Sequence, residues 1–491
     1  MARWRRPSST GMGPNAHWLG RSLARFGWVL SLACVLPACT GLAPVNEPVE
    51  QVDATRGYRL KTLVSRHHPE TLVILTFSGG GTRAAALSFG VLEELRRTPM
   101  VIRGRTGNFL EYVDVMTGAS GGSFTALSYA LLGERLFSEY EQRFLKRDVQ
   151  GELLKRVVSP NRWRDLWSPT YGRSELAADF YDEILFDGAT YGDLLKRDTP
   201  AVVVSGTDLS TGARFQFSQD DFDYLCSDLS KVRLSRAAAA SSAVPVVLSP
   251  VTFFNYAGKC QVRMPTWVSD VSKGGWSSRP AGRALLRYRD ILNITDNRKR
   301  PYLHIVDGGI SDNLGLRGIL EAFEEFEASA AFRREMNIEQ LRQVVIISVN
   351  SRSSPSTDWD TSRTPPGFLS QLLQSSSVPI DHFSSESMEL LKDTAANWEL
   401  RRQLAILKRQ LAGKSLAEAE AEVPKMSLFD VEISFDAIAD PTERDYFMNL
   451  PTSFSLPDEA VDRLRALGAR LLRESPEFQT SVKSINAQSI P

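Results

Sequence analysis

The sequence predicts an α/β fold, with a three-layer core around a mostly parallel central sheet and a largely helical C-terminal extension. Three glycine-rich turns carry this prediction, at 78–81, 118–122 and 307–309. Each turn follows an apolar run of strand length and precedes a helix-like segment. Strands that alternate with helices favour a parallel sheet between helical layers. Ligands bind beyond the carboxyl ends of such strands, where all three turns would lie.

The apolar runs are continuous rather than alternating. The first is Leu72–Phe77 (LVILTF), and further apolar strand candidates occur at 201–205 and 343–349. Residues 112–117 are also strand-like, and 303–306 lead into the third glycine turn. Continuous apolarity is typical of strands that are buried on both faces, as in parallel sheets. We therefore expect these five segments to form the centre of the sheet.

Beyond residue 352 the composition of the sequence changes. Residues 353–383 are rich in Ser and Pro and are expected to form an exposed connection. Charged, amphipathic spacing predicts helices over 385–411 and 457–473, whereas LFDVEISF at 428–435 has the length of an added strand. We expect residues 353–491 to be a mainly helical extension that packs on the core.

Composition excludes some functions. Lys and Arg total 58 and so do Asp and Glu, so the net charge is zero. The chain has no excess of positive charge that would attract nucleic-acid phosphates, and we therefore expect no nucleic-acid partner. The five histidines show no metal-ligand spacing, so neither a metal site nor a cofactor is expected.

The N-terminus has the pattern of an export signal. Five arginines lie between residues 3 and 25, followed by the apolar run Phe26–Leu36, which is shorter than the ~20 residues of a bilayer-spanning helix. Leu36-Pro37-Ala38 before Cys39 resembles the bacterial lipobox, in which cleavage leaves the cysteine as a lipidated first residue. Thr40 after the cysteine fits sorting to an outer membrane. The alternative is a plain signal peptide that contains a chance cysteine.

Two cysteines, Cys226 and Cys260, remain after the signal and the expected anchor. In an exported protein disulfides persist, so an even pair that flanks one segment predicts a bridge. Two independent buried thiols are the alternative.

The pattern G-x-S-x-G at 118–122 predicts a nucleophile elbow. Ser120 would stand on a strained turn between strand and helix, and side chains at Gly118 and Gly122 would collide with that turn. The alternative is a glycine-rich turn whose serine has no role.

A hydrolase serine needs a base, which in the usual triad is a histidine. His304 lies inside a predicted strand, and no histidine follows a candidate acid in the order of an α/β-hydrolase. A histidine triad is therefore poorly supported, and another group must take the serine proton. Asp307 places a carboxylate at the end of a later strand, before Gly308 and Gly309. Taken alone, Asp307-Gly308 is also common as a simple tight turn.

The first glycine turn, Gly79-Gly80-Gly81, offers consecutive backbone amides at a helix start, which suits an anion or an oxyanion. Two alternatives stay open. Gly79-x-Gly81-x-x-Ala84 resembles a truncated dinucleotide-binding fingerprint, and Arg83 could be an ordinary solvated helix residue. Two other polar candidates, Asp208 and Asp312, are expected to be structural caps.

Taken together, three motifs in this order resemble patatin-like phospholipases: G-G-G-x-R at 79–83, G-x-S-x-G at 118–122 and D-G-G at 307–309. The resemblance covers roughly residues 71–350, with weaker echoes at 207–212 and 236–245.

The resemblance implies a Ser–Asp dyad without histidine. Ser120 would be the nucleophile and Asp307 the base. Gly79, Gly80 and Gly81 would form the oxyanion hole, and Arg83 would brace the loop or meet a head-group phosphate.

The resemblance and the N-terminus together imply four segments: a lipoprotein-type signal peptide over 1–38, a tether over 39–70, a patatin-like acyl hydrolase domain over 71–352 and the extension over 353–491. The implied activity is cleavage of membrane-lipid carboxylic esters through an acyl-enzyme, by a protein anchored at Cys39 to the outer membrane and facing the periplasm. A catalytically idle lipid- or partner-binding envelope lipoprotein and a soluble-ester or thioester hydrolase remain as alternatives.

Overall fold

The computed structural model describes residues 46–64, 69–102, 105–159, 171–245, 247–262, 264, 282–328, 340–354, 359–423 and 425–488. Residues 44–491 form one compact unit. The expected signal peptide and Cys39 lie outside the described residues. No helix in the described part of the chain combines the length and the apolar character needed to cross a bilayer.

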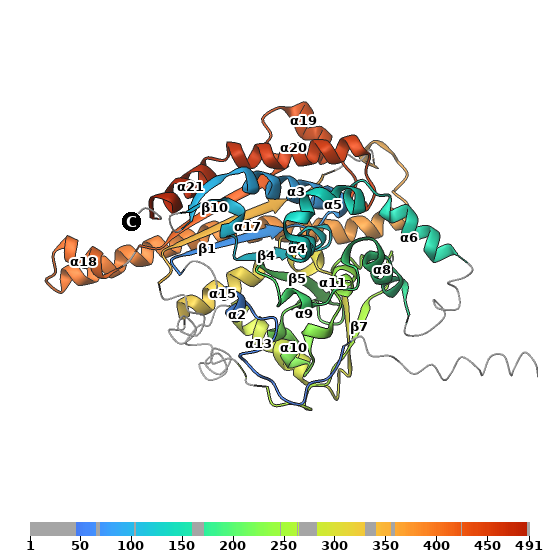
Figure 1. The fold of residues 1–491 in the computed structure, drawn as a ribbon, viewed down its shortest axis with the longest axis horizontal. Coiled ribbons are helices and arrows are strands. Elements are labelled where there is room, and N and C mark those ends of the chain that lie inside the picture. The colour runs from blue at the N-terminus through green and yellow to red at the C-terminus, as the bar shows by residue number, and fades with distance from the viewer. Residues whose placement is uncertain are drawn as a thin grey trace, which may run out of the picture. The chain divides into compact units, whose positions relative to one another are not determined.

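A mostly parallel sheet forms the centre of the unit, in the order β10-β9-β1-β4-β5-β8-β7, with β6 paired to β5 (Figure 1). Five neighbouring strands run parallel, and β6, β7 and β8 run antiparallel to their partners. The bounds of the parallel strands are β1 Thr71–Phe77, β4 Val115–Gly118, β5 Ala201–Asp208, β9 Gln343–Asn350 and β10 Ser427–Ser434. Those of the others are β6 Arg214–Gln216, β7 Val251–Phe254 and β8 Tyr302–Asp307, while β2 Pro99–Ile102 and β3 Arg105–Asn108 form a separate hairpin.

The predicted fold class is confirmed. The central strands β5 and β9 are buried along their whole length, as their continuous apolar sequences indicate. One predicted strand was too long: residues 109–112 form a 3-10 turn, and β4 begins only at Val115. An Asn108–Glu111 capping box favours that turn over an extended chain.

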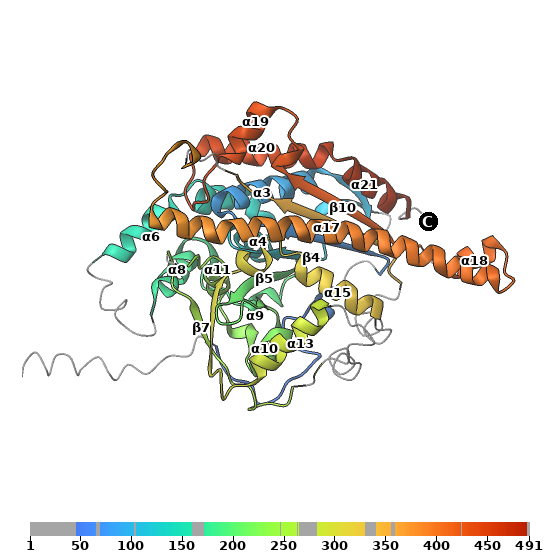
Figure 2. The ribbon, with the colours of Figure 1, turned by 180° about the vertical axis from the view of Figure 1, so that it is seen from behind.

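Helices cover both faces of the sheet. α3 and α20 pack on one face, and α15 and α17 on the other (Figures 1 and 2). The helices of the core are α2 Leu60–Val64, α3 Gly81–Arg97, α4 Gly121–Leu132, α5 Leu136–Tyr140, α6 Val149–Val158, α8 Arg173–Tyr181, α9 Tyr191–Leu194, α10 Gln219–Tyr224, α11 Leu234–Ser241, α13 Gly282–Thr295, α14 Gly309–Asp312 and α15 Arg317–Ala328.

The C-terminal extension is largely helical, with α17 Phe368–Leu411, α18 Leu416–Glu422, α19 Pro441–Met448, α20 Asp458–Glu474 and α21 Pro476–Gln488. It also adds the expected edge strand, because β10 pairs in parallel with β9. The prediction of an exposed connection over 353–383 is wrong for its second half, because α17 begins at Phe368 and continues through Pro379. Proline normally ends a helix interior, which is why the sequence suggested a later start.

From residue 46 onward the expected tether is part of the folded unit, which corrects that expectation. The buried Asn46 side-chain amide donates to Ser227 Oγ at 2.9 Å. The buried Arg59 pairs with Asp220 at 2.6 Å and with Asp223 at 2.7 Å. Nearby, Cys226 and Cys260 are joined by a disulfide.

Candidate active site

Ser120 occupies a strained turn between β4 and α4. Its φ of 46° is positive, which residues other than glycine rarely adopt, and its ψ is −122°. The flanking glycines allow close backbone contact: a Cβ on Gly118 would lie 2.8 Å from Ser123 N, and one on Gly122 would lie 2.6 Å from Phe77 O. The turn therefore has the geometry of a nucleophile elbow.

Ser241, at the end of α11, joins the serine turn to the aspartate turn. The Ser120 amide donates to Ser241 Oγ at 2.9 Å, and that hydroxyl donates to Ser205 O at 2.6 Å. The Ser241 carbonyl accepts the Gly308 amide at 3.0 Å. Ser241 had no predicted role, although it lies inside the 236–245 segment that resembles the family.

Asp307 ends β8 and lies beside Ser120. Its side chain accepts the Gly309 amide at 2.7 Å and a hydrogen bond from the Ser120 side chain. Burial raises the pKa of Asp307 to about 6, and these two hydrogen bonds lower it by less than burial raises it. The two residues that the sequence paired are therefore in contact, and both are almost fully buried.

The triple-glycine turn lies against the elbow. A Cβ on Gly79 would be 3.3 Å from Ser120 Cβ, and one on Gly121 would be 2.7 Å from Gly81 N. Gly80 and Gly81 have φ values of 137° and 61° and begin α3. The backbone amides of this helix start thus lie close to the serine.

Gly79 was expected in the oxyanion hole, and Arg83 was expected to brace the loop or meet a head-group phosphate; both have partners within the protein. The Gly79 amide donates to Asn313, at 3.0 Å to the carbonyl and 3.1 Å to Oδ1. The buried Arg83 donates to Ser351 O at 2.8 Å and to Leu450 O at 2.7 Å, and burial lowers its pKa to about 10. Arg83 therefore braces the loop, which is one of the two roles expected for it.

Because the Gly79 amide already donates to Asn313, the remaining candidate oxyanion donors are the amides of Gly80 and Gly81. For neither does the structure give an acceptor among the described residues.

The other polar candidates have structural partners. Asp208 pairs with Arg300, and Asp312 accepts the Arg317 amide at the start of α15. His304 lies 2.9 Å from Thr252 Oγ1. Among the residues described, no group of His, Cys, Asp and Glu could hold a metal ion.

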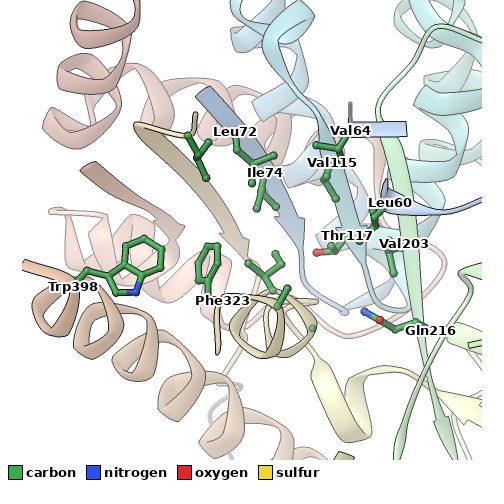
Figure 3. Close-up of a pocket in the computed structure, with 14 residues that line it drawn as sticks. Leu60, Val64, Leu72, Ile74, Val115, Thr117, Val203, Gln216, Phe323 and Trp398 are labelled. Atoms are coloured by element: carbon green, nitrogen blue, oxygen red, sulfur yellow. The ribbon is translucent and has the colours of Figure 1, made fainter. Parts of the chain in front are cut away.

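An apolar cavity of about 110 Å³ lies between the sheet and helices α15 and α17 (Figure 3). Ile74 and Val115 line it from the strands, and Phe323 and Trp398 line it from the helices. Neither Ser120 nor Asp307 belongs to its lining.

An α/β sheet that carries a serine on a strained strand-to-helix turn, next to a buried carboxyl and a glycine-rich helix start, is the arrangement of a serine hydrolase. The sequence model of the family described as patatin-like phospholipase matches residues 75–320. The chain therefore belongs to the patatin-like phospholipase family, a family of lipid hydrolases.

Solved structures to which the chain has some similarity include human GIVD cytosolic phospholipase A2, with 12% identity and a TM-score of 0.43 over 92% of this chain and 69% of that chain. The same human enzyme in complex with methyl gamma-linolenyl fluorophosphonate gives 13% identity and a TM-score of 0.39, covering 88% of this chain and 61% of that chain. VipD from Legionella pneumophila gives 12% identity and a TM-score of 0.27, over 81% and 67%. No curated protein sequence matches the chain significantly.

Proposed function

We propose that this protein is a serine acyl hydrolase that cleaves carboxylic esters of lipids, with Ser120 as nucleophile and Asp307 as base. One observation carries the proposal: the Ser120 side chain hydrogen-bonds to a carboxyl whose pKa burial has raised to about 6. A carboxylate with an ordinary pKa of ~3.9 is a weak base for an alcohol. A pKa closer to neutral pH makes proton transfer from the hydroxyl less costly.

In the acylation step, Asp307 accepts the hydroxyl proton while Ser120 Oγ attacks the ester carbonyl carbon. The carbonyl electron pair moves onto oxygen, and the amides of Gly80 and Gly81 are the proposed donors to that oxyanion. When the tetrahedral intermediate collapses, the bond to the alcohol breaks. The alcohol leaves with the proton that Asp307 had accepted.

In the deacylation step, Asp307 accepts a proton from water, and the hydroxide attacks the acyl-enzyme carbonyl. Collapse of this second intermediate breaks the bond to Ser120 Oγ, which recovers the proton from Asp307. The products are a free acid and an alcohol, and the enzyme returns to its starting state.

The test compares the wild type with Ser120→Ala and Asp307→Asn on a soluble short-chain ester and on phospholipid vesicles. Ser128→Ala is the matched control, because Ser128 is a buried serine of α4, the helix that follows Ser120, and its hydroxyl has no hydrogen-bond partner among the described residues. We expect both site variants to lose activity while the control keeps it. Activity retained by either site variant contradicts the proposed dyad.

The same assay separates the alternatives. Hydrolysis of the soluble ester alone favours a soluble-ester or thioester hydrolase. A folded wild type that binds vesicles but hydrolyses neither substrate favours an idle lipid-binding protein.

We further propose that Cys39 carries a lipid anchor that holds the protein at the outer membrane, facing the periplasm. The support is sequence alone, namely the basic leader, the short apolar run and the small residues before Cys39. Several acyl chains on one cysteine suffice for stable attachment. Mass spectrometry of the mature N-terminus, with Cys39→Ala as control, tests the anchor; an unmodified or uncleaved Cys39 contradicts it.

A further inference from the structure

Asn313, four residues beyond Gly309, contacts the glycine loop directly. Its backbone carbonyl and its side-chain Oδ1 both accept the Gly79 amide, at 3.0 and 3.1 Å. It follows the short helix α14, which starts immediately after the aspartate turn. One residue thus links the turn that carries Asp307 to the turn that carries the amides of Gly80 and Gly81.

The other end of the Asn313 side chain is held by the C-terminal extension. Asn313 Nδ2 donates to Ser384 Oγ at 3.2 Å, and Ser384 Oγ donates to Ile380 O at 2.8 Å. Ser384 lies on α17 and is buried. A single amide group is therefore an acceptor toward the glycine loop and a donor toward α17, which fixes its orientation.

Asn313 also lies near the proposed base. A Cβ on Gly309 would be 3.0 Å from Asn313 Oδ1 and 3.0 Å from Asp307 Oδ1. The two oxygens are therefore no farther apart than twice that distance. The neutral amide of Asn313 does not repel the ionised Asp307 carboxylate, whereas a carboxylate at position 313 would.

From these contacts we propose that Asn313 is a positioning residue, which holds the Gly80 and Gly81 amides toward the oxyanion, and that Ser384 on α17 holds Asn313 in place. The inference rests on the function proposed above. By binding the Gly79 amide, Asn313 sets the orientation of the peptide groups that follow. Small displacements of oxyanion donors weaken transition-state stabilisation, and a misplacement of about 1 Å can cost on the order of 100-fold in rate.

The experiment measures kcat and KM on the soluble ester for Asn313→Ala, Asn313→Asp and Ser384→Ala, with thermal unfolding as a fold check. Asn293→Asp on the exposed face of α13 is the charge-matched control. We expect Asn313→Ala to lower kcat by up to about 100-fold with little change in KM. Ser384→Ala should lower kcat by less, because Asn313 keeps its contact with Gly79.

The Asn313→Asp variant tests the role through the pH–rate profile, which a purely structural role of Asn313 would leave unchanged. Its carboxylate can still accept the Gly79 amide, so kcat at high pH should recover relative to Asn313→Ala. Its negative charge should move the acid limb of the pH–rate profile upward by about one to two pH units. The control should leave the limb in place.

An unchanged kcat in a folded Asn313→Ala, or an unmoved acid limb in Asn313→Asp, would overturn the positioning role. Labelling with a fluorophosphonate separates this failure from failure of the proposed function. If the wild type is labelled at Ser120 and Asn313→Ala is labelled equally fast, only the positioning role is lost. If Ser120→Ala retains hydrolysis, the proposed function fails and this inference fails with it.

Discussion

The raised pKa of Asp307 gives the sharpest prediction, because it sets both the pH dependence of activity and a stability cost. If the ionised carboxyl is the base, activity should fall tenfold per pH unit below about 6 and be constant above it. At pH 5 a group with that pKa is about one-tenth ionised, whereas one with an ordinary pKa of 3.8 would be more than nine-tenths ionised.

The stability effect has the opposite sign from that of a salt-bridged carboxylate. Between pH 3.8 and about 6 the folded protein holds a proton that the unfolded chain has lost, so the free energy of unfolding declines as pH rises through this window. At 1.36 kcal/mol per pH unit, the full cost above pH 6 is about 3 kcal/mol. Asp307→Asn keeps an acceptor for the Gly309 amide and removes the charge. It should therefore be inactive yet more stable than the wild type at pH 7.5.

The assay is a pH–rate profile on a soluble ester, together with urea unfolding at pH 7.5 and pH 4. Asp430→Asn is the matched control, because burial also raises the pKa of Asp430 to about 6, but Asp430 lies on the edge strand β10. The control should leave the acid limb unchanged. An acid limb near pH 4 in the wild type, an acid limb abolished in the control, or an Asp307→Asn variant less stable at pH 7.5 would refute this reasoning.

Three further predictions concern the fold around the site. Replacing Cys226 and Cys260 by Ser, a pair 34 residues apart, should lower the free energy of unfolding by about 4 kcal/mol in urea; equal stability with and without reductant in the wild type would count against it. Ser241→Ala leaves the Ser120 amide without its acceptor, so it should lower the free energy of unfolding by about 1–3 kcal/mol and reduce kcat. Kinetics equal to those of the wild type would show that the turn keeps its geometry without this hydrogen bond. Gly90→Ala would place a Cβ 2.1 Å from Arg465 O and should lower the unfolding midpoint by forcing α3 and α20 apart; an unchanged midpoint would mean that α20 adjusts freely.

Much of the site could be predicted because local rules determine it. The G-x-S-x-G pattern specifies a turn in which Gly118 and Gly122 are required by backbone contacts within a few residues or with the adjacent strand. Continuous apolar runs likewise identified the buried strands. Ser120 follows the carboxyl end of β4, as the motif predicts. Asp307 ends β8, which runs antiparallel to β5, so Asp307 does not lie at the shared carboxyl edge that the sequence suggested but pairs with Gly206 of β5. The contact between Ser120 and Asp307 follows from the sheet order.

The parts that sequence reasoning missed depend on contacts between distant segments. Asn313 and Ser384 are ordinary polar residues in their own sequence surroundings, and only the path of α17 brings them together. The partners of Gly79 could not be read from its motif for the same reason. The start of α17 was also misplaced, because Pro379 is a local helix breaker whose effect is overridden in the folded chain.

The domain boundary expected at residue 352 does not separate two independent structures, because residues on both sides of it contact the glycine turn at 79–81. Arg83 follows the glycine turn, yet the acceptors of its guanidinium are Ser351 O, Leu450 O and Thr452 Oγ1. A buried guanidinium without acceptors is costly, so the helix start that offers the proposed oxyanion donors depends on residues far beyond the 75–320 match. Ser384 adds a second link from the extension to the same loop. The family motifs bring Ser120 and Asp307 together, and residues of the C-terminal segments contact the glycine turn beside them.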